Sequence, residues 1–191
     1  MRIRNDIQIR TERSQEFEII DTLVKHSFSE GTNISDGIGE VALIHEIRQS
    51  PYYIPELSFV AVKEDKIVGH LMFSQFSLAK TKDHLDCYDK DAKLVLLAPV
   101  AVHIDHLREG IGSTMLQLGI EKVKEAGYRG IILEGNYRFY ETLGFQTSAH
   151  YHIYPTGGYP LTEPRCLMCM EMYPEALKEM NGYVIYLYEN A

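Results

Sequence analysis

The spacing of apolar residues changes several times along the chain and predicts a succession of strands and helices. Alternating apolar and polar residues over Ile7 to Arg10 predict a short first strand. Capping residues in Thr11-Glu-Arg-Ser14 are followed by apolar residues at helical spacing, which predict a helix through Val24. The same spacing predicts a second helix over 37–49, and Ser50-Pro51 ends it.

The middle of the chain has the period of strands. Residues 58–62 and 67–73, joined by the polar turn 64–66, predict a β-hairpin, and the charged segment 80–93 predicts a solvated loop. Residues 94–102 form the most apolar run, which predicts a central strand covered on both faces. Because Pro99 lacks the N–H that a regular central strand uses, we expect a bulge or a splayed edge there.

The remaining pattern predicts a long helix over 110–126, a short buried strand over 130–133, a short helix over 137–143 and a Tyr-rich tail of strands. Helices that alternate with strands around an apolar central strand predict an α/β or α+β layered domain. No seam in composition divides the 191 residues, so we expect one domain over 1–191.

Composition narrows the possible partners. The chain carries 19 basic and 27 acidic residues, a formal net charge of -8, and no long basic run, so nucleic-acid binding is not expected. Neither a signal-peptide pattern at the amino terminus nor an apolar stretch of membrane length is present, which predicts a cytoplasmic protein that does not bind membranes.

Cysteine and histidine pairs offer little chemistry. Cys166-Leu-Met-Cys169 has a redox spacing but falls in a predicted strand, where residues three apart point to opposite faces. Cys87 lies in the charged loop with no paired histidine, so no acyl-cysteine intermediate is expected. His150-Tyr-His152 would place two imidazoles on one face of a strand, yet no third ligand is evident. We therefore predict no metal site.

The segment between the central strand and the long helix carries the candidate chemistry. No Ser, Thr, Asp or Asn stands directly before the helix to cap its free N–H groups. Gly110 and Gly112 lack side chains, so their turn could place its amides around a pyrophosphate at the positive end of the helix dipole. A plain strand-to-helix turn is the alternative. The glycine spacing does not match that of a P-loop or a Rossmann fold.

Two motifs resemble the GNAT superfamily of N-acetyltransferases. Val102-His-Ile-Asp-His-Leu-Arg-Glu-Gly-Ile-Gly112 is similar to the family's Gln/Arg-x-x-Gly-x-Gly/Ala motif, although Leu107 stands at the Gln/Arg position and Glu109 replaces a commonly basic residue. Residues 131–145 resemble the family's strand and short helix with Tyr-x-x-x-Gly-Phe, here Tyr140, Gly144 and Phe145. The resemblance covers about residues 5 to 150.

The resemblance implies a mixed, mostly antiparallel twisted sheet with a splay at the central strand and helices on both faces. Acetyl-CoA would be the co-substrate, with no metal. Its pantetheine arm would lie between the central strand and the strand 130–133. It would bond to the backbone of the central strand, as an added strand would. The cofactor contacts that we expect are Val100, Ala101, Val102, Leu107, Arg108, Glu109, Gly110, Ile111, Gly112, Ser113, Asn136 and Tyr140.

The resemblance also implies acetyl transfer to a primary amine of a small molecule or peptide, by direct attack in a ternary complex. Tyr140 is the candidate general acid for the departing thiolate, and aromatic packing is its alternative role. Asn136 bonds the pantetheine or caps its helix. The base is open among Glu40, Glu46, Glu134, His150 and water. The tail 151–191 completes the sheet, covers the acceptor or forms a homodimer contact. The alternatives are a non-catalytic acyl-CoA sensor and a protein without a CoA site.

Overall fold

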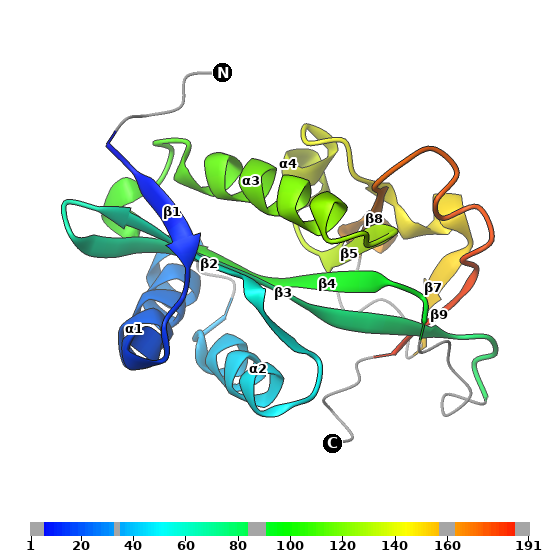
Figure 1. Cartoon of the computed structure of the whole chain (residues 1–191), viewed down its shortest axis with the longest axis horizontal. Coiled ribbons are helices and arrows are strands. Elements are labelled where there is room, and N and C mark those ends of the chain that lie inside the picture. The colour runs from blue at the N-terminus through cyan, green and yellow to red at the C-terminus, as the bar shows by residue number, and fades with distance from the viewer. Residues whose placement is uncertain (1–5, 33–34, 84–90, 157–162, 186–191) are drawn as a thin grey trace. The chain divides into compact units, whose positions relative to one another are not determined.

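The computed structural model describes residues 6–32, 35–83, 91–156 and 163–185 (Figure 1). Within these ranges the strands are β1 (Gln8–Thr11), β2 (Tyr53–Lys63), β3 (Lys66–Ala79), β4 (Leu94–Val102), β5 (Gly130–Glu134), β6 (Gln146–Thr147), β7 (Ile153–Pro155), β8 (Leu167–Glu171) and β9 (Gly182–Ile185). The helices are α1 (Phe17–His26), α2 (Ile38–Gln49), α3 (Ile111–Glu125) and α4 (Tyr137–Glu141), with a π-helical turn η2 (Ser27–Thr32) and 3-10 turns η1 (Ser14–Glu16), η3 (Ile104–His106), η4 (Ser148–Tyr151) and η5 (Pro164–Cys166).

The strands form a mixed and mostly antiparallel sheet. Hydrogen-bonded neighbours follow the order β1-β2-β3-β4-β5-β8-β6, and β9 pairs with β3 and β7. The pairs β4–β5 and β7–β9 are parallel, whereas β1–β2, β3–β9, β5–β8 and β6–β8 are antiparallel. This architecture confirms the predicted fold class.

Contacts divide the chain into two compact units. The first contains the residues up to Phe73 together with Ala98–Lys122, and the second contains Ser74–Leu97 together with the residues from Val123 onward. Strands β3 and β4 each contribute to both units. The expectation of a single N-acetyltransferase domain over 1–191 stays a prediction.

In the first unit the predicted hairpin becomes β2 and β3. Glu64 and Asp65 both have positive φ, 50° and 60°, and such turns match the twist of the two strands. Helix α3 covers one face of β3, since a Cβ at Gly69 would lie 2.7 Å from Met115 Sδ. His70 points to the opposite face, where Arg48 of α2 bonds the same carboxylate. Helices therefore cover both faces of the sheet in this unit.

The predicted central strand is β4, whose residues Leu94–Leu97 are all buried. Its pairing with β5 joins Leu94–Leu96 to Gly130–Ile132 and stops short of Pro99. The Ala98–Pro99 peptide is cis. The expected interruption of pairing near Pro99 is thus present in the ladder, while the strand itself continues to Val102.

In the second unit β8 pairs with both β5 and β6. Five residues of β5 pair with β8, from Gly130↔Glu171 to Glu134↔Leu167. A Cβ at Gly130 would lie 2.7 Å from Leu177, so only glycine lets that side chain pack against the strand. Leu177 is completely buried, which makes the turn after β8 part of the core of this unit.

The prediction of a strand around His150 and His152 was wrong. Ser148–Tyr151 form the 3-10 turn η4, and His152 has a left-handed φ of 57° because its N–H bonds back to Ala149 O at 3.1 Å. Two imidazoles that follow such a turn do not share a strand face. In the described part of the chain, no group of three His, Cys, Asp or Glu side chains is placed to hold a metal.

The cysteine pair also departs from expectation, because Cys166 ends η5 and only Cys169 lies in a strand, β8. Both are free thiols, and burial raises the pKa of each. Cys87 lies outside the described residues.

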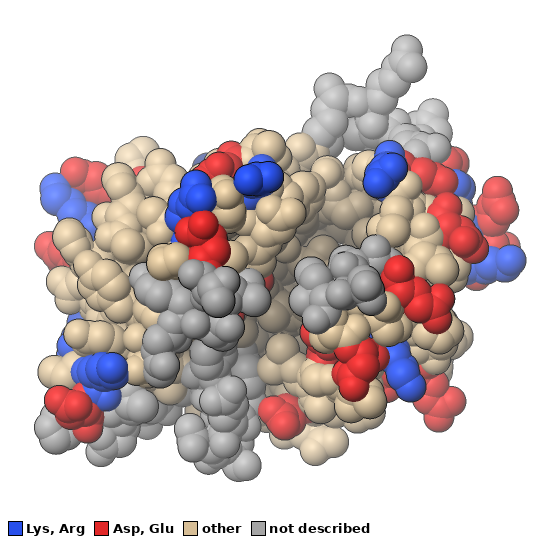
Figure 2. All heavy atoms as spheres, turned by 180° about the vertical axis from the view of Figure 1, so that it is seen from behind, with Lys and Arg blue, Asp and Glu red and all other residues tan. Residues whose placement is uncertain are grey.

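None of the described helices is both long and apolar enough to span a bilayer. Figure 2 shows basic and acidic side chains interspersed over the face that it draws.

Candidate functional site

The turn between β4 and α3 leads directly into the N-terminus of a long helix. Arg108 and Gly110 both have left-handed conformations, with φ of 63° and 82°. These two residues bend the backbone immediately before the helix. The first N–H groups of α3, which begins at Ile111, have no partner within the helix. The turn therefore leads into a helix N-terminus, where free N–H groups can bind an anion.

The space over Gly110 is open. A Cβ built on Gly110 would meet no atom within 4 Å, while one on Gly112 would touch only Val102 Cγ2 at 3.4 Å. Thr114 satisfies the carbonyl of Gly110 twice, through its N–H at 3.0 Å and its hydroxyl at 2.9 Å. The carbonyl of Gly110 is thus held by the helix, and the space beside the Cα of Gly110 is free of atoms from the described residues.

The acidic residue of the turn is paired. The Glu109 carboxylate accepts a hydrogen bond from Lys63 Nζ at 2.9 Å and lies 3.3 Å from His106 Nδ1. The Lys63 ammonium and the His106 ring hold the pKa of Glu109 below its ordinary value. Leu107 and Arg108 are exposed beside it. Lys63, at the end of β2, is a residue that the sequence did not single out, because 46 positions separate it from Glu109.

At the end of β4, the N–H of Val102 has a hydrogen-bond partner, Ser27, that was not predicted. The N–H of His103 bonds to Val68 O of β3 at 2.9 Å. Because adjacent residues of a strand direct their N–H groups to opposite edges, the N–H of Val102 faces the other edge. There it bonds to the Ser27 hydroxyl oxygen at 3.3 Å. Val100 and Val102 are half-buried and Ala101 is buried.

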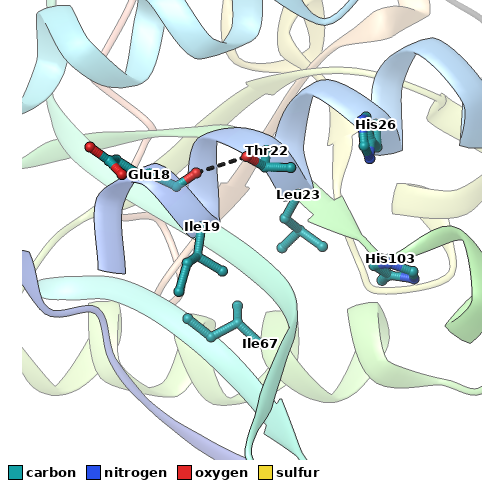
Figure 3. A pocket seen from close by; sticks show the side chains of 7 residues that line it. All are labelled: Glu18, Ile19, Thr22, Leu23, His26, Ile67 and His103. Atoms are coloured by element: carbon teal, nitrogen blue, oxygen red, sulfur yellow. Dashed lines mark hydrogen bonds between the residues drawn. The ribbon is translucent and has the colours of Figure 1, made fainter. Parts of the chain in front are cut away.

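A pocket of about 450 Å³ lies against α1 in the same unit. Its lining residues come from α1, from the start of β3 and from the residue after β4: Glu18, Ile19, Thr22, Leu23, His26, Ile67 and His103. Figure 3 shows Ile19, Leu23 and Ile67 between Glu18 at one end and the two imidazoles at the other. Ile19 is 55% exposed, an unusual value for so large an apolar side chain. No sequence pattern predicted this pocket.

Tyr140 is held by aromatic packing in the second unit. Its ring stands edge-on to Phe139 and Phe145, with centroids 5.1 and 5.6 Å away. A Cβ at Gly135 would lie 2.6 Å from Tyr140 Cε2, so glycine at this position makes room for the ring. Burial raises the pKa of Tyr140 to about 12. The phenol is therefore protonated at neutral pH and is a hydrogen-bond donor.

Asn136 caps α4, one of the two roles expected for it. Its Oδ1 accepts the N–H of Arg138 at 3.2 Å. Of the candidate bases, Glu40 already accepts the hydroxyl hydrogen of Ser35, whose Oγ lies 2.8 and 2.9 Å from the two carboxylate oxygens. Glu46 is exposed on α2, Glu134 ends β5, and His150 is exposed in η4. The base stays open.

A buried charged cluster, the Glu12 network, escaped the sequence analysis. The side chain of Glu12 is 1% exposed and accepts bonds from Arg48 Nη2 at 2.8 Å and from the Tyr53 hydroxyl at 2.7 Å. His70 Nε2, on a fully buried ring, lies 3.0 Å from the same carboxylate. Arg48 also contacts Asp21 Oδ1 at 3.2 Å. The cluster joins α1, α2, β2 and β3 to the residue that follows β1.

In this network Glu12 and Arg48 are charged, whereas His70 is neutral. Burial alone would raise the pKa of Glu12, but bonds from His70 and Arg48 outweigh it and hold the pKa far below the ordinary value. Burial lowers the pKa of His70, against the effect of Glu12. His70 is therefore neutral near pH 7 and donates its Nε2–H to the carboxylate, while Arg48 balances the charge.

The layered sheet, the strand that loses its partner before Pro99 and the glycine turn that leads into α3 together define the class of N-acetyltransferase folds. Residues 22–145 match the family described as the acetyltransferase (GNAT) family. The chain belongs to this family and is a GNAT-type N-acetyltransferase.

Relatives agree with this membership. The uncharacterized N-acetyltransferase YhbS of Escherichia coli K12 is 26% identical over 135 residues, 70% of each chain. A crystal structure of E. coli YhbS in complex with CoA superposes with a TM-score of 0.79, at 22% identity, over 97% of this chain and 93% of that one. A GNAT family acetyltransferase from Brucella melitensis, in complex with acetyl-CoA, gives a TM-score of 0.71 at 22% identity, over 94% and 95%.

Proposed function

We propose that the protein transfers an acetyl group from acetyl-CoA to a primary amine of a small molecule or peptide. The glycine turn at Gly110 carries this proposal, because it offers an anion the free N–H groups of a helix N-terminus and open space beside Gly110. The solved E. coli and B. melitensis relatives, which bind CoA and acetyl-CoA, support the choice of donor.

In this proposal the amides of Gly110 to Ser113 bind the pyrophosphate of the donor. The pairing of Glu109 with Lys63 supports it, since the carboxylate is held by a cation instead of opposing the phosphates. Arg108 and Leu107 flank the site, and Ile111 anchors the helix by its buried side chain. The backbone of Val100, Ala101 and Val102 receives the pantetheine arm.

The reaction is a direct attack. The unprotonated amine forms a C–N bond with the acetyl carbonyl carbon, the C–S bond breaks, and the amine loses its proton to a base or to water. Tyr140 donates a hydrogen bond to the sulfur that leaves. Because its pKa of about 12 lies above that of a thiol, near 8.5, this donation stabilises the developing thiolate before a proton is fully transferred. Asn136 fixes the start of the helix that carries Tyr140.

Calorimetric titration of the purified protein with acetyl-CoA and with CoA tests the donor. We expect saturable binding of both at one site per chain, after which a panel of amines is tested for acetylation. Absence of binding would make the turn merely structural and would overturn the proposal. Radiolabelled acetyl that stays on the denatured protein would instead overturn direct attack.

The variant Tyr140→Phe tests the acid. We expect kcat to fall by about 10² to 10⁴, while CoA affinity stays at the wild-type value, because general acid assistance contributes a factor of that size. The matched control is Tyr137→Phe on the same helix, whose hydroxyl accepts a bond from Arg165 at 2.9 Å. An unchanged kcat in Tyr140→Phe would assign the tyrosine to packing alone.

A further inference from the structure

The hydroxyl of Ser27 occupies the free edge of β4. Ser27 follows α1 directly and is fixed by its own N–H, which bonds to Leu23 O and Val24 O. The residue is 4% exposed, and its oxygen accepts the N–H of Val102 at 3.3 Å. The backbone of α1 thus places one buried hydroxyl on a strand residue that the resemblance assigns to the pantetheine arm.

This hydroxyl keeps an unused donor. A serine hydroxyl has one hydrogen to donate and two lone pairs to accept with. Among the described residues the Ser27 hydroxyl hydrogen has no acceptor, whereas the hydroxyl of Ser29, two positions on, donates to Lys25 O at 2.8 Å. A buried donor without a partner is costly, so a ligand acceptor at this point would be favoured.

The edge itself is the one that a ligand would extend. The N–H of Val102 faces away from β3, because the N–H of the next residue, His103, bonds to Val68 O of β3. Hydrogen-bonded pairing along β4 toward β5 has already stopped at Leu96. An extended ligand with amide groups that approached Val102 on this edge would meet the Ser27 hydroxyl before the N–H.

We propose that Ser27 is a positioning residue for the donor: its oxygen accepts the Val102 N–H, and its hydrogen donates to an amide carbonyl of the pantetheine arm. This inference rests on the proposed function. Of the backbone contacts proposed above, only that of the Val102 N–H then passes through the Ser27 hydroxyl. This contact couples the position of α1 to occupancy by the donor.

The test compares two ligands and three variants by calorimetry. The ligands are CoA and 3′-phosphoadenosine 5′-diphosphate, which carries the same phosphates but no pantetheine arm. In Ser27→Ala we expect CoA to bind about three- to tenfold more weakly, the size of one neutral hydrogen bond, while the nucleotide binds as to wild type. Ser29→Ala should change neither affinity, and Ser27→Thr, which keeps the hydroxyl, should recover CoA binding.

Each outcome is decisive. Equal or tighter CoA binding by Ser27→Ala would overturn the relay and show that the serine only caps the strand. An equal loss of both ligands would also overturn it, since the serine would then act on the fold and not on the arm. Failure of the wild-type protein to bind either ligand would instead contradict the proposed function.

Discussion

Two polar regions of the first unit are built in opposite ways. The Glu12 network buries charged side chains that are bonded to one another across four elements. The turn from Leu107 to Ser113 has its acidic side chain, Glu109, paired with Lys63, and it leads into a helix N-terminus with open space beside Gly110. Polar groups that bond each other hold the fold, and polar groups that the fold leaves open are available to a ligand. We therefore expect substitutions in the Glu12 network to affect mainly stability, and substitutions in the turn to affect mainly ligand binding.

Removal of Glu12 should give the largest effect. The variant Glu12→Ala leaves Arg48 buried without its main partner, and loss of one partner of a buried pair costs about 3 to 5 kcal/mol in the free energy of unfolding. Urea unfolding measures this loss. The control is Glu16→Ala, which breaks the more exposed pair with Arg10 and should cost under about 1 kcal/mol. Similar losses in the two variants would contradict the contrast between buried and exposed pairs.

Acid should weaken the same network. His70 and Glu12 both have lowered pKa values in the folded protein, so the unfolded chain takes up their protons first. The stability that they contribute is therefore present at pH 7 and is lost below about pH 6.5 for His70 and below about pH 4.3 for Glu12. We expect His70→Gln to flatten the fall in unfolding free energy between pH 7 and pH 5.5. The control His150→Gln, at an exposed histidine, should keep the wild-type slope.

The sequence predicted what local spacing records. Helix α3 and strand β4 were found from their apolar periods, and the turn between them from two glycines in a known motif. The Glu12 network was missed because Arg48 and His70 lie 36 and 58 positions away from Glu12, and Glu12 itself stood in a stretch interpreted as a helix cap. A single histidine inside the apolar run of β3 was the one local sign of it.

Short polar segments were the other source of error. Around His150 the pattern could not separate a strand from the 3-10 turn η4, because one backbone bond from His152 to Ala149 decides the conformation. Ser27 carried no signal at all, since its partner Val102 lies 75 positions away. In the candidate site, main-chain features were therefore predictable from glycine and proline, and the side chains that reach them from other elements were not.

At the turn, glycine replacement should affect binding more than stability. Gly110→Ala places a methyl group in the open space beside Gly110, on a residue with a left-handed conformation, which costs about 1 to 2 kcal/mol. Gly127→Ala is a matched control, because Gly127 has a φ of 79° and equally open space. We expect both variants to lose similar stability, and only Gly110→Ala to bind CoA about tenfold more weakly. Equal CoA affinities would place the donor elsewhere.

The smallest expected effect comes from Glu109. Its carboxylate sits beside the proposed pyrophosphate site and occupies Lys63, so Glu109→Gln removes a negative charge and frees a positive one. We expect CoA to bind about two- to fivefold more tightly at low salt, because charges near the surface interact weakly in water. The gain should shrink as ionic strength rises. Glu121→Gln, at an exposed acid further along α3, should leave the affinity unchanged. Weaker binding in Glu109→Gln would mean that Glu109 supports the site by holding Lys63 and His106 in place, and the acid of the turn would then belong with the structural pairs of the Glu12 network.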